Sequence, residues 1–227
     1  MAGKMVSFPS NGQQAEGYLA MPASGKGAGI VVIQEWWGLN ENIKGIADRL
    51  AAEGYRALAP DLYHGKETAE PDDAMKLMMA MNRDQAAKDM SGAYDHLKAH
   101  EAGTGKVGSI GWCMGGGLSL YLATQRPVDA CVVFYGVLPA PPDVTKLAGP
   151  VLGHYAANDG YLSVDSVRSL EKQINDAGKS AEFHIYENTQ HGFFNDSEQS
   201  KKGGVHAPEA AQHAWERTIG FYKKNLS

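Results

Sequence analysis

Short apolar runs alternate with helical stretches along most of this chain of 227 residues. Runs typical of strands cover 28–34, 55–60, 106–112, 128–135, 150–156 and 182–187, and helical patterns cover 41–53, 74–100, 114–125, 163–177 and 208–224. Because a helix that joins two strands brings them side by side in the same direction, this order predicts an α/β fold with a mostly parallel central sheet and helices on both faces. The length suits a single domain over residues 1–227.

The N-terminal segment follows another pattern, which predicts an antiparallel hairpin. Residues 5–8 and 15–21 have strand character and flank the turn signal Ser10-Asn11-Gly12. The other expected interruptions are loops at 61–71 and 136–148, the second with Pro139, Pro141 and Pro142, and a break in the long helical stretch near Asn82. A hairpin at the start would make the sheet mixed.

The run Gly111-Trp112-Cys113-Met114-Gly115-Gly116 lies where the strand 106–112 meets the helix 114–125. It matches the G-x-S-x-G pattern of a nucleophile elbow with cysteine in place of serine. Glycines flank the centre because a side chain there would collide with the neighbouring strand or helix. Cys113 is therefore a candidate nucleophile at a helix N-terminus, which favours a thiolate. The alternative is a buried thiol that only packs in a glycine-rich turn.

Candidate partners for a nucleophile follow two later strands. Asp159 comes just after the strand 150–156, and His191 comes just after the strand 182–187. Nucleophile, acid and histidine follow in this order when such an elbow works with an oriented base, and open α/β sheets place their sites at the carboxyl ends of strands. Each residue also has a plainer interpretation: Asp159 before Gly160 as a turn aspartate, and His191 as a loop residue.

Composition argues against several other classes of protein. The net charge of −5 and the lack of a basic run argue against nucleic acid and against an anionic membrane surface. No apolar stretch reaches the length of a membrane span, and the N-terminus lacks the apolar core of a signal peptide. The two cysteines, Cys113 and Cys131, cannot form a disulfide framework. We therefore expect a cytoplasmic protein, in which a thiol stays reduced.

The sequence gives no support for a metal site or a nucleotide site. No H-E-x-x-H spacing occurs, so we expect no metal. G-x-x-x-x-G-K-[ST] does not occur, and G-x-G-x-x-G occurs only as Gly103-Thr104-Gly105-Lys106-Val107-Gly108, which leads into the strand 106–112 and does not join a strand to a helix. We therefore expect no nucleotide cofactor.

Several motifs together resemble the dienelactone hydrolase family of the α/β-hydrolase superfamily. They are Gln34-Glu35-Trp36-Trp37-Gly38-Leu39-Asn40, Ala59-Pro60-Asp61-Leu62-Tyr63, the elbow run 111–116, Phe134-Tyr135-Gly136, Asn158-Asp159 and His191-Gly192-Phe193. The resemblance covers nearly the whole chain. It implies an α/β-hydrolase fold and a hydrolase that acts on a small carboxylic ester or lactone. We expect a monomer or weak dimer.

The resemblance also implies roles for particular residues. Cys113, Asp159 and His191 would form a triad that works through a thioacyl intermediate. Glu35 would take the proton of the thiol as substrate binds, although without the family context it is better interpreted as a loop carboxylate in a salt bridge. The backbone N–H groups of Trp36 and Met114 would form the oxyanion hole.

Four further residues are candidates to line the substrate pocket: Tyr135, Trp37, Tyr63 and Asn195. Tyr135 matches a pocket residue of the family, and the alternative is a core tyrosine with a satisfied hydroxyl. The sequence leaves open whether Arg83 contributes a charge to the pocket and whether His64 lies at the mouth of the site.

The sequence departs from the family pattern where dienelactone-specific members bind the substrate carboxylate. Those members use arginines, one of them four residues after the catalytic histidine, where this chain has Asn195. The segment near 71–73, which would supply another, carries acids. Each lost charge-assisted contact removes about 1.5–3 kcal/mol of binding. We therefore expect a neutral ester, lactone or thioester as substrate. The alternative is a retired hydrolase that binds a small molecule or senses thiol chemistry.

Overall fold

The computed structural model describes residues 2–136 and 142–227, and in this part of the chain an eight-stranded sheet has the order β1-β2-β4-β3-β5-β6-β7-β8. The strands are β1 Lys4–Ser10, β2 Gln13–Ala20, β3 Gly27–Ile33, β4 Arg56–Pro60, β5 Gly103–Trp112, β6 Ala130–Phe134, β7 Val151–Ala156 and β8 Ala181–Tyr186. The pairs β1/β2 and β2/β4 are antiparallel, and every pair from β4 to β8 is parallel. The mixed sheet with an N-terminal hairpin is confirmed.

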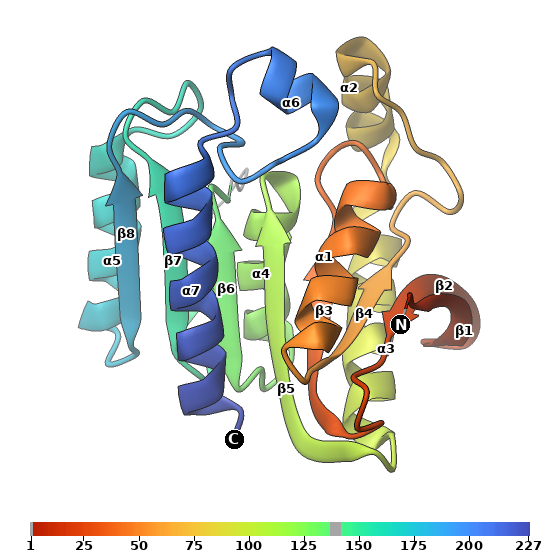
Figure 1. Ribbon diagram of the computed structural model, residues 1–227. Coiled ribbons are helices and arrows are strands. Elements are labelled where there is room, and N and C mark those ends of the chain that lie inside the picture. The colour runs from red at the N-terminus through yellow and green to blue at the C-terminus, as the bar shows by residue number, and fades with distance from the viewer. Residues whose placement is uncertain (1, 137–141) are drawn as a thin grey trace.

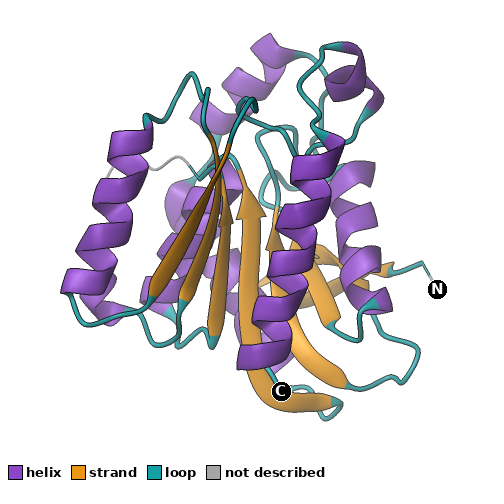
Figure 2. Ribbon diagram, turned by 60° about the vertical axis from the view of Figure 1, so that its left-hand side comes forward, coloured by secondary structure: helices purple, strands orange, loops and turns teal. Residues whose placement is uncertain are grey.

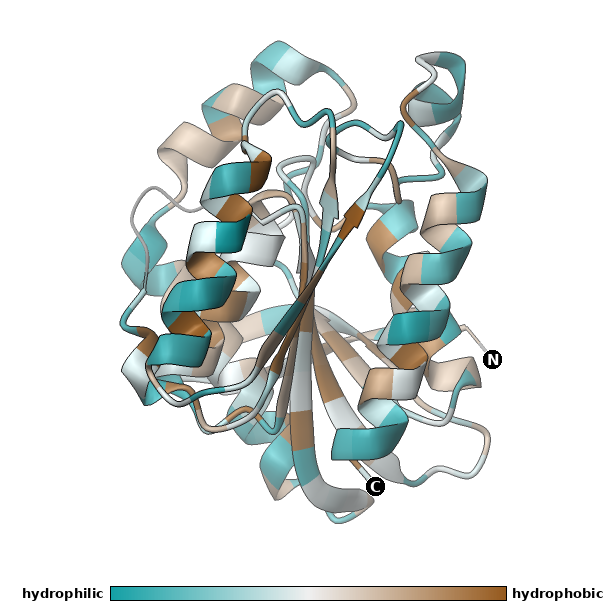
Figure 3. Ribbon diagram, turned by 90° about the vertical axis from the view of Figure 1, so that its left-hand side faces the viewer, coloured by the Kyte–Doolittle hydropathy of each residue, from teal (hydrophilic) through white to brown (hydrophobic). Residues whose placement is uncertain are grey.

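Helices cover both faces of the sheet, as Figures 1 and 2 show. They are α1 Glu41–Ala52, α2 Pro71–Ala80, α3 Arg83–Ala99, α4 Met114–Gln125, α5 Val164–Asp176, α6 Glu198–Lys202 and α7 Pro208–Asn225. Helices α1 and α7 pack on one face, and α3, α4 and α5 pack on the other. Helices α1 and α5 turn apolar stripes inward and polar faces outward (Figure 3), which is the pattern of helices laid on a sheet, whereas α4 is buried nearly all round.

The central strands are apolar along nearly their whole length because helices bury them on both sides. Every residue of β4, β6 and β7 is buried, and so is every residue of β3 except Gly27. Side chains of alternate strand positions enter two separate cores, one under α1 and α7 and one under α3, α4 and α5. This is the sequence signature of parallel strands in an α/β protein.

Several elements differ from the sequence predictions, among them β5, which begins at Gly103 and not at Lys106. Helix α2 begins at Pro71, inside the stretch predicted as a loop, because proline fits the first turn of a helix. The short helix α6 was not predicted. A 3-10 turn, Val144–Lys146, interrupts the loop predicted for 136–148, whose residues 137–141 lie outside the described part of the chain. The predicted break near Asn82 is confirmed, because the Asn82 side chain caps α3 by accepting from the Gln85 N–H.

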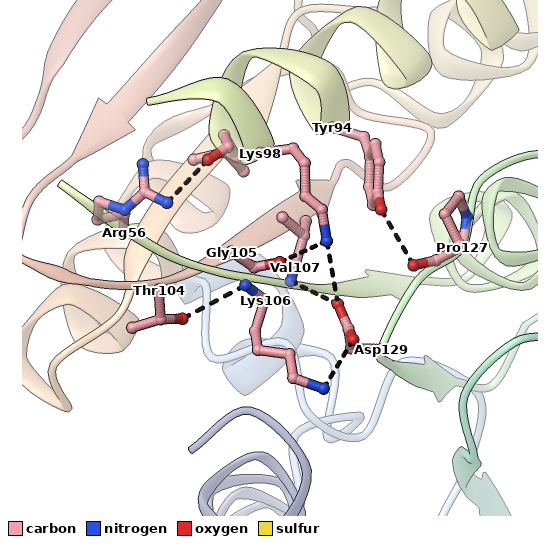
Figure 4. Close-up of polar contacts among 10 residues, drawn as sticks. Arg56, Tyr94, Lys98, Thr104, Gly105, Lys106, Val107, Pro127 and Asp129 are labelled. Carbon is pink, nitrogen blue, oxygen red and sulfur yellow. Dashed lines mark hydrogen bonds and ion pairs between the residues drawn. The ribbon is translucent and has the colours of Figure 1, made fainter. Parts of the chain in front are cut away.

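Polar contacts at the amino-terminal edge of the parallel strands hold α3 and β5 together (Figure 4). The Asp129 carboxylate accepts from Lys106 Nζ at 3.0 Å and from the Val107 N–H at 2.9 Å. The buried Arg56 guanidinium donates to the carbonyls of Gly27 and Leu97, both at 2.8 Å, and so caps the end of α3. The opposite, carboxyl edge carries the elbow and the loops after β3, β4, β7 and β8.

Candidate active site

The elbow joins β5 directly to α4, with Cys113 as the single residue between them. Its backbone has φ 54° and ψ −121°, a conformation that costs a non-glycine residue about 1–3 kcal/mol. Three backbone hydrogen bonds hold it there: the Cys113 N–H donates to the Phe134 carbonyl at 3.1 Å, and the Cys113 carbonyl accepts from the N–H groups of Gly116 and Gly117. The structure thus has the strand–turn–helix geometry that the motif predicts.

The resting thiol of Cys113 is held in its protonated form. Burial, together with the carboxylates of Glu35 and Asp159, raises the pKa of the Cys113 thiol to about 12, although a hydrogen bond from the Met114 N–H lowers it in part. The helix N-terminus alone therefore does not produce a thiolate. A base must remove the proton when substrate binds.

Asp159 and His191 form a hydrogen-bonded pair although 32 residues separate them in the chain. His191 Nδ1 lies 2.8 Å from Asp159 Oδ2, and the other carboxylate oxygen accepts the N–H groups of Tyr161 at 2.8 Å and Leu162 at 3.2 Å. Because an ionised carboxylate can only accept, Nδ1 carries a proton, and in the neutral imidazole Nε2 then has the free lone pair. Nε2 is buried and has no hydrogen-bond partner in the described residues.

Two tyrosines enclose the imidazole of His191. The ring centroids of Tyr135 and Tyr161 each lie 4.9 Å from that of His191. Tyr161 is 71% exposed, so one side of the imidazole is covered by an aromatic ring that faces solvent. Sequence reasoning missed Tyr161, and its position two residues after Asp159, in the same loop, was the available signal.

Glu35 is buried and its carboxylate accepts a hydrogen bond from Asn195 Nδ2 at 2.6 Å. Burial raises the pKa of Glu35 to about 7, while Asn195, His191 and Tyr135 lower it in part. The other end of the Asn195 amide accepts the Ser197 N–H at 3.0 Å. The amide nitrogen and the amide oxygen of Asn195 thus both have hydrogen-bond partners within the protein. That Asn195 binds substrate stays a prediction.

Tyr135 follows β6 in a left-handed backbone conformation, with φ 37°. Its N–H donates to the His154 carbonyl at 2.7 Å, which fixes the turn. The hydroxyl is buried beside the Glu35 carboxylate, and burial together with that charge raises the pKa of Tyr135 well above its usual value. Tyr135 is therefore a neutral hydrogen-bond donor in the site.

The remaining predicted residues lie on loops beside the elbow. The indole rings of Trp36 and Trp37 contact each other with centroids 5.0 Å apart, and both residues are half-buried. The Trp37 carbonyl accepts the Thr68 N–H at 3.0 Å, which ties this loop to the segment that leads into α2. Tyr63 is buried, with Oη 3.7 Å from Met114 Sδ.

Replacing Glu35 with glutamine should change how stability depends on pH. The folded-state pKa of about 7 exceeds the ordinary value of 4.5, so the folded protein holds a proton that the unfolded chain releases between these values. Wild-type stability should therefore fall as pH rises from about 4.5 to 7, by about 3 kcal/mol. The Glu35→Gln variant should lack this loss and be more stable at pH 8. Urea unfolding at pH 4.5 and 8 measures both.

A matched control is Glu209→Gln, since Glu209 is exposed on α7 and keeps its carboxylate in water. Its unfolding free energy should follow that of the wild type at both pH values. An equal loss of stability in the wild type and in Glu35→Gln would contradict the assignment to Glu35.

Comparison with known proteins agrees with this geometry. The model of the dienelactone hydrolase family matches residues 15–226. The chain belongs to the dienelactone hydrolase family. Protein usf of Aquifex pyrophilus is 39% identical to it over 99% of this chain and 100% of its own length. A protein of Saccharolobus solfataricus, provisionally named carboxymethylenebutenolidase, is 34% identical over 97% of this chain and 98% of its own length.

Solved structures show the same α/β-hydrolase architecture. A provisionally assigned dienelactone hydrolase from Klebsiella pneumoniae superposes with a TM-score of 0.86 at 27% identity, over 98% of each chain. The structure entitled m3DLH has a TM-score of 0.86 at 26% identity over the full length of both chains. The dienelactone hydrolase fold is therefore shared along the whole chain and not only around the elbow.

Arg83 and His64, whose roles the sequence did not decide, lie on or beside α3. Arg83 is exposed in the first turn of α3. Nε2 of His64 lies 3.6 Å from Asp89 Oδ2 on α3, and the His64 side chain is 57% exposed.

In residues 2–136 and 142–227, no three His, Cys, Asp or Glu side chains cluster as metal ligands would. No helix in the same ranges has both the length and the apolar character of a membrane span.

Proposed function

We propose that this chain hydrolyses neutral carboxylic esters or lactones, with Cys113 as nucleophile, Glu35 as the acceptor of the thiol proton, and the Asp159–His191 pair as the base that activates water. Membership of the dienelactone hydrolase family supports a hydrolase that acts on ester or lactone bonds. The observation that carries the finer assignment is the 2.8 Å bond between His191 Nδ1 and Asp159 Oδ2, which leaves Nε2 free at the edge of the sheet where the elbow lies. A complete acid–base pair argues against a retired enzyme.

Acylation begins with removal of the thiol proton. With a pKa of about 12 at Cys113 and about 7 at Glu35, the proton stays on sulfur until substrate changes the surroundings of the two groups. Glu35 then accepts the proton, and Sγ attacks the carbonyl carbon. The C–O bond to the leaving group breaks, and the departing alkoxide takes up the proton, so that the first product is the alcohol.

Deacylation uses the histidine. His191 Nε2 takes a proton from water, and the resulting hydroxide attacks the thioester carbon. The C–S bond breaks, the acid product leaves, and the proton returns from His191 to the thiolate. Asp159 stabilises the imidazolium that forms, because it accepts the Nδ1–H throughout.

The oxyanion of both tetrahedral intermediates would lie between the N–H groups of Trp36 and Met114. These two segments are close in space because Gly115, one residue after Met114, packs against the carbonyls of Ile33 and Gln34. The Met114 N–H also lies in the first turn of α4, where the helix dipole favours negative charge.

A substrate panel tests the proposed specificity. We expect hydrolysis of small 4-nitrophenyl esters and neutral lactones, with kcat/KM at least about tenfold above that for a dienelactone carboxylate, since Asn195 carries no charge to bind the carboxylate. Spectrophotometric rates on matched neutral and anionic substrates measure this ratio. A preference for the carboxylate, or no hydrolysis of any ester, lactone or thioester, would contradict the proposal. We still expect a cytoplasmic location, because a reducing compartment keeps the thiol active. We also still expect a monomer or weak dimer.

A further inference from the structure

The loop Asp61-Leu62-Tyr63-His64-Gly65, which follows β4, is fixed by its own backbone contacts. The Asp61 carboxylate accepts the N–H of Tyr63 at 3.0 Å and of Gly65 at 2.5 Å. The Leu62 N–H donates to the buried Gln34 side chain at 3.1 Å, directly before Glu35 in the chain. Hydrogen bonds within the loop therefore fix its shape, and one further hydrogen bond connects it to the segment that carries Glu35 and Trp36.

His64, the next residue along this loop, lies close to α3. His64 has a φ of 52°, a strained conformation for histidine, and its Nε2 lies 3.6 Å from Asp89 Oδ2. The Asp89 carboxylate is fully buried and accepts from Ser10 Oγ at 2.6 Å and Gln85 Nε2 at 2.9 Å. Tyr63 thus lies between Leu62, whose N–H is hydrogen-bonded to Gln34, and His64, and its own side chain is buried.

The hydroxyl of Tyr63 lacks the partner that a buried phenol usually has. Tyr94 donates to the Pro127 carbonyl at 3.0 Å and Tyr222 to the Ser109 carbonyl at 2.8 Å. The Tyr63 hydroxyl instead contacts the thioether of Met114 at 3.7 Å, and a thioether is a weak acceptor. Its O–H is thus available to a stronger acceptor close to the residue that follows Cys113.

The charge state of Tyr63 suits a donor. Burial raises the pKa of Tyr63 above its usual value, and the neighbouring Cys113 raises it further. The hydroxyl therefore keeps its proton when a thiolate or an oxyanion forms beside it. A neutral, prepositioned donor stabilises a developing negative charge without having to reorganise.

We propose that the Tyr63 hydroxyl is a third hydrogen-bond donor to the oxyanion of the tetrahedral intermediate, beside the N–H groups of Trp36 and Met114. The phenol ring and its oxygen stay in place, and only the O–H bond rotates from Met114 Sδ toward the oxyanion as the carbonyl carbon becomes tetrahedral. The inference rests on the proposed function, because it assigns a role in that reaction. No bond to Tyr63 forms or breaks, and its proton stays on the phenol oxygen.

The test compares Tyr63→Phe with the wild type in rapid-mixing acylation by a 4-nitrophenyl ester. The acylation rate should fall about 10- to 100-fold, with KM within threefold of the wild type, because the donor acts in the transition state and not on bound substrate. Tyr94→Phe is the matched control: it removes one phenol hydroxyl on α3 and should leave the acylation rate unchanged. Circular dichroism and melting curves check that both variants fold.

An aldehyde that matches the acyl group separates a catalytic role from a structural one. It forms a hemithioacetal with Cys113 whose oxygen occupies the oxyanion position, so its affinity should fall in parallel with the acylation rate in Tyr63→Phe. The affinity of the corresponding amide, which keeps a trigonal carbonyl, should change less than threefold. An acylation rate within threefold of the wild type, or a lower rate without weaker aldehyde binding, would overturn the inference and leave the proposed function standing. A wild type without ester hydrolysis would overturn both.

Discussion

Replacing Cys113 with alanine should lower kcat/KM for a 4-nitrophenyl ester by about 10³-fold or more, because the proposed covalent route then has no nucleophile. Residual hydrolysis would come from the oxyanion donors and from water activated by His191. The substitution removes one sulfur from a half-buried position and should leave the melting temperature close to that of the wild type. Steady-state rates on purified, folded variants measure the loss.

The second cysteine gives the matched control. Cys131 is buried on β6, and its Sγ lies 3.5 Å from Ser119 Oγ, in the core under α3, α4 and α5. Cys131→Ala should keep the activity of the wild type and lose about 1 kcal/mol of stability from the small cavity. Equal rates in the wild type and in Cys113→Ala would show that Cys113 is not the nucleophile. Loss of activity in Cys131→Ala alone would show that Cys131 on β6 is the reactive thiol.

Gly111→Ala should prevent stable folding. A Cβ built at Gly111 would overlap the carbonyl carbon and oxygen of Gly115, and these are backbone atoms of α4 that cannot rotate away. Relief requires β5 and α4 to separate at the elbow, so we expect a loss of about 4 kcal/mol or more, a large part of the stability of a typical domain. Thermal unfolding followed by circular dichroism measures it. The activity should fall with the folded fraction.

Gly220→Ala controls for the substitution itself. A Cβ at Gly220, in the middle of α7, would meet no heavy atom within 4 Å. Alanine should therefore stabilise the helix by about 0.5–1 kcal/mol. A Gly111→Ala variant that melts like the wild type would show that the elbow does not need the close approach between β5 and α4.

Regular patterns made most of the fold predictable from the sequence. Strands β3, β4, β6 and β7 are almost entirely apolar because helices cover both faces, and Gly111 and Gly115 mark a junction where strand and helix approach closely. The miss at α2 has a physical reason as well. Pro71 is a helix-start signal, but the acids after it resemble a polar loop, and only Ala74 of that helix is buried.

For the site, chain order predicted which residues the sheet brings together, but not how their side chains pair. Asp159 and His191 were predictable because each follows a strand at the same edge. Three side-chain contacts could not be predicted: the hydrogen bond from Asn195 to Glu35, the packing of Tyr161 on His191, and the weak contact of the Tyr63 hydroxyl with Met114 Sδ. These depend on side-chain packing between segments far apart in the chain, and no local spacing encodes it.

The most direct test of the central claim, that Cys113 attacks the substrate and carries its acyl group, is intact-protein mass spectrometry after rapid acid quench of a reaction with 4-nitrophenyl butyrate. We predict one added butyryl group, placed on the peptide that contains Cys113 and absent from Cys113→Ala. His191→Ala should accumulate any adduct it forms, because deacylation then lacks its base. Turnover of the ester with no acyl group on Cys113 at any quench time, or with the group on another residue, would contradict the account.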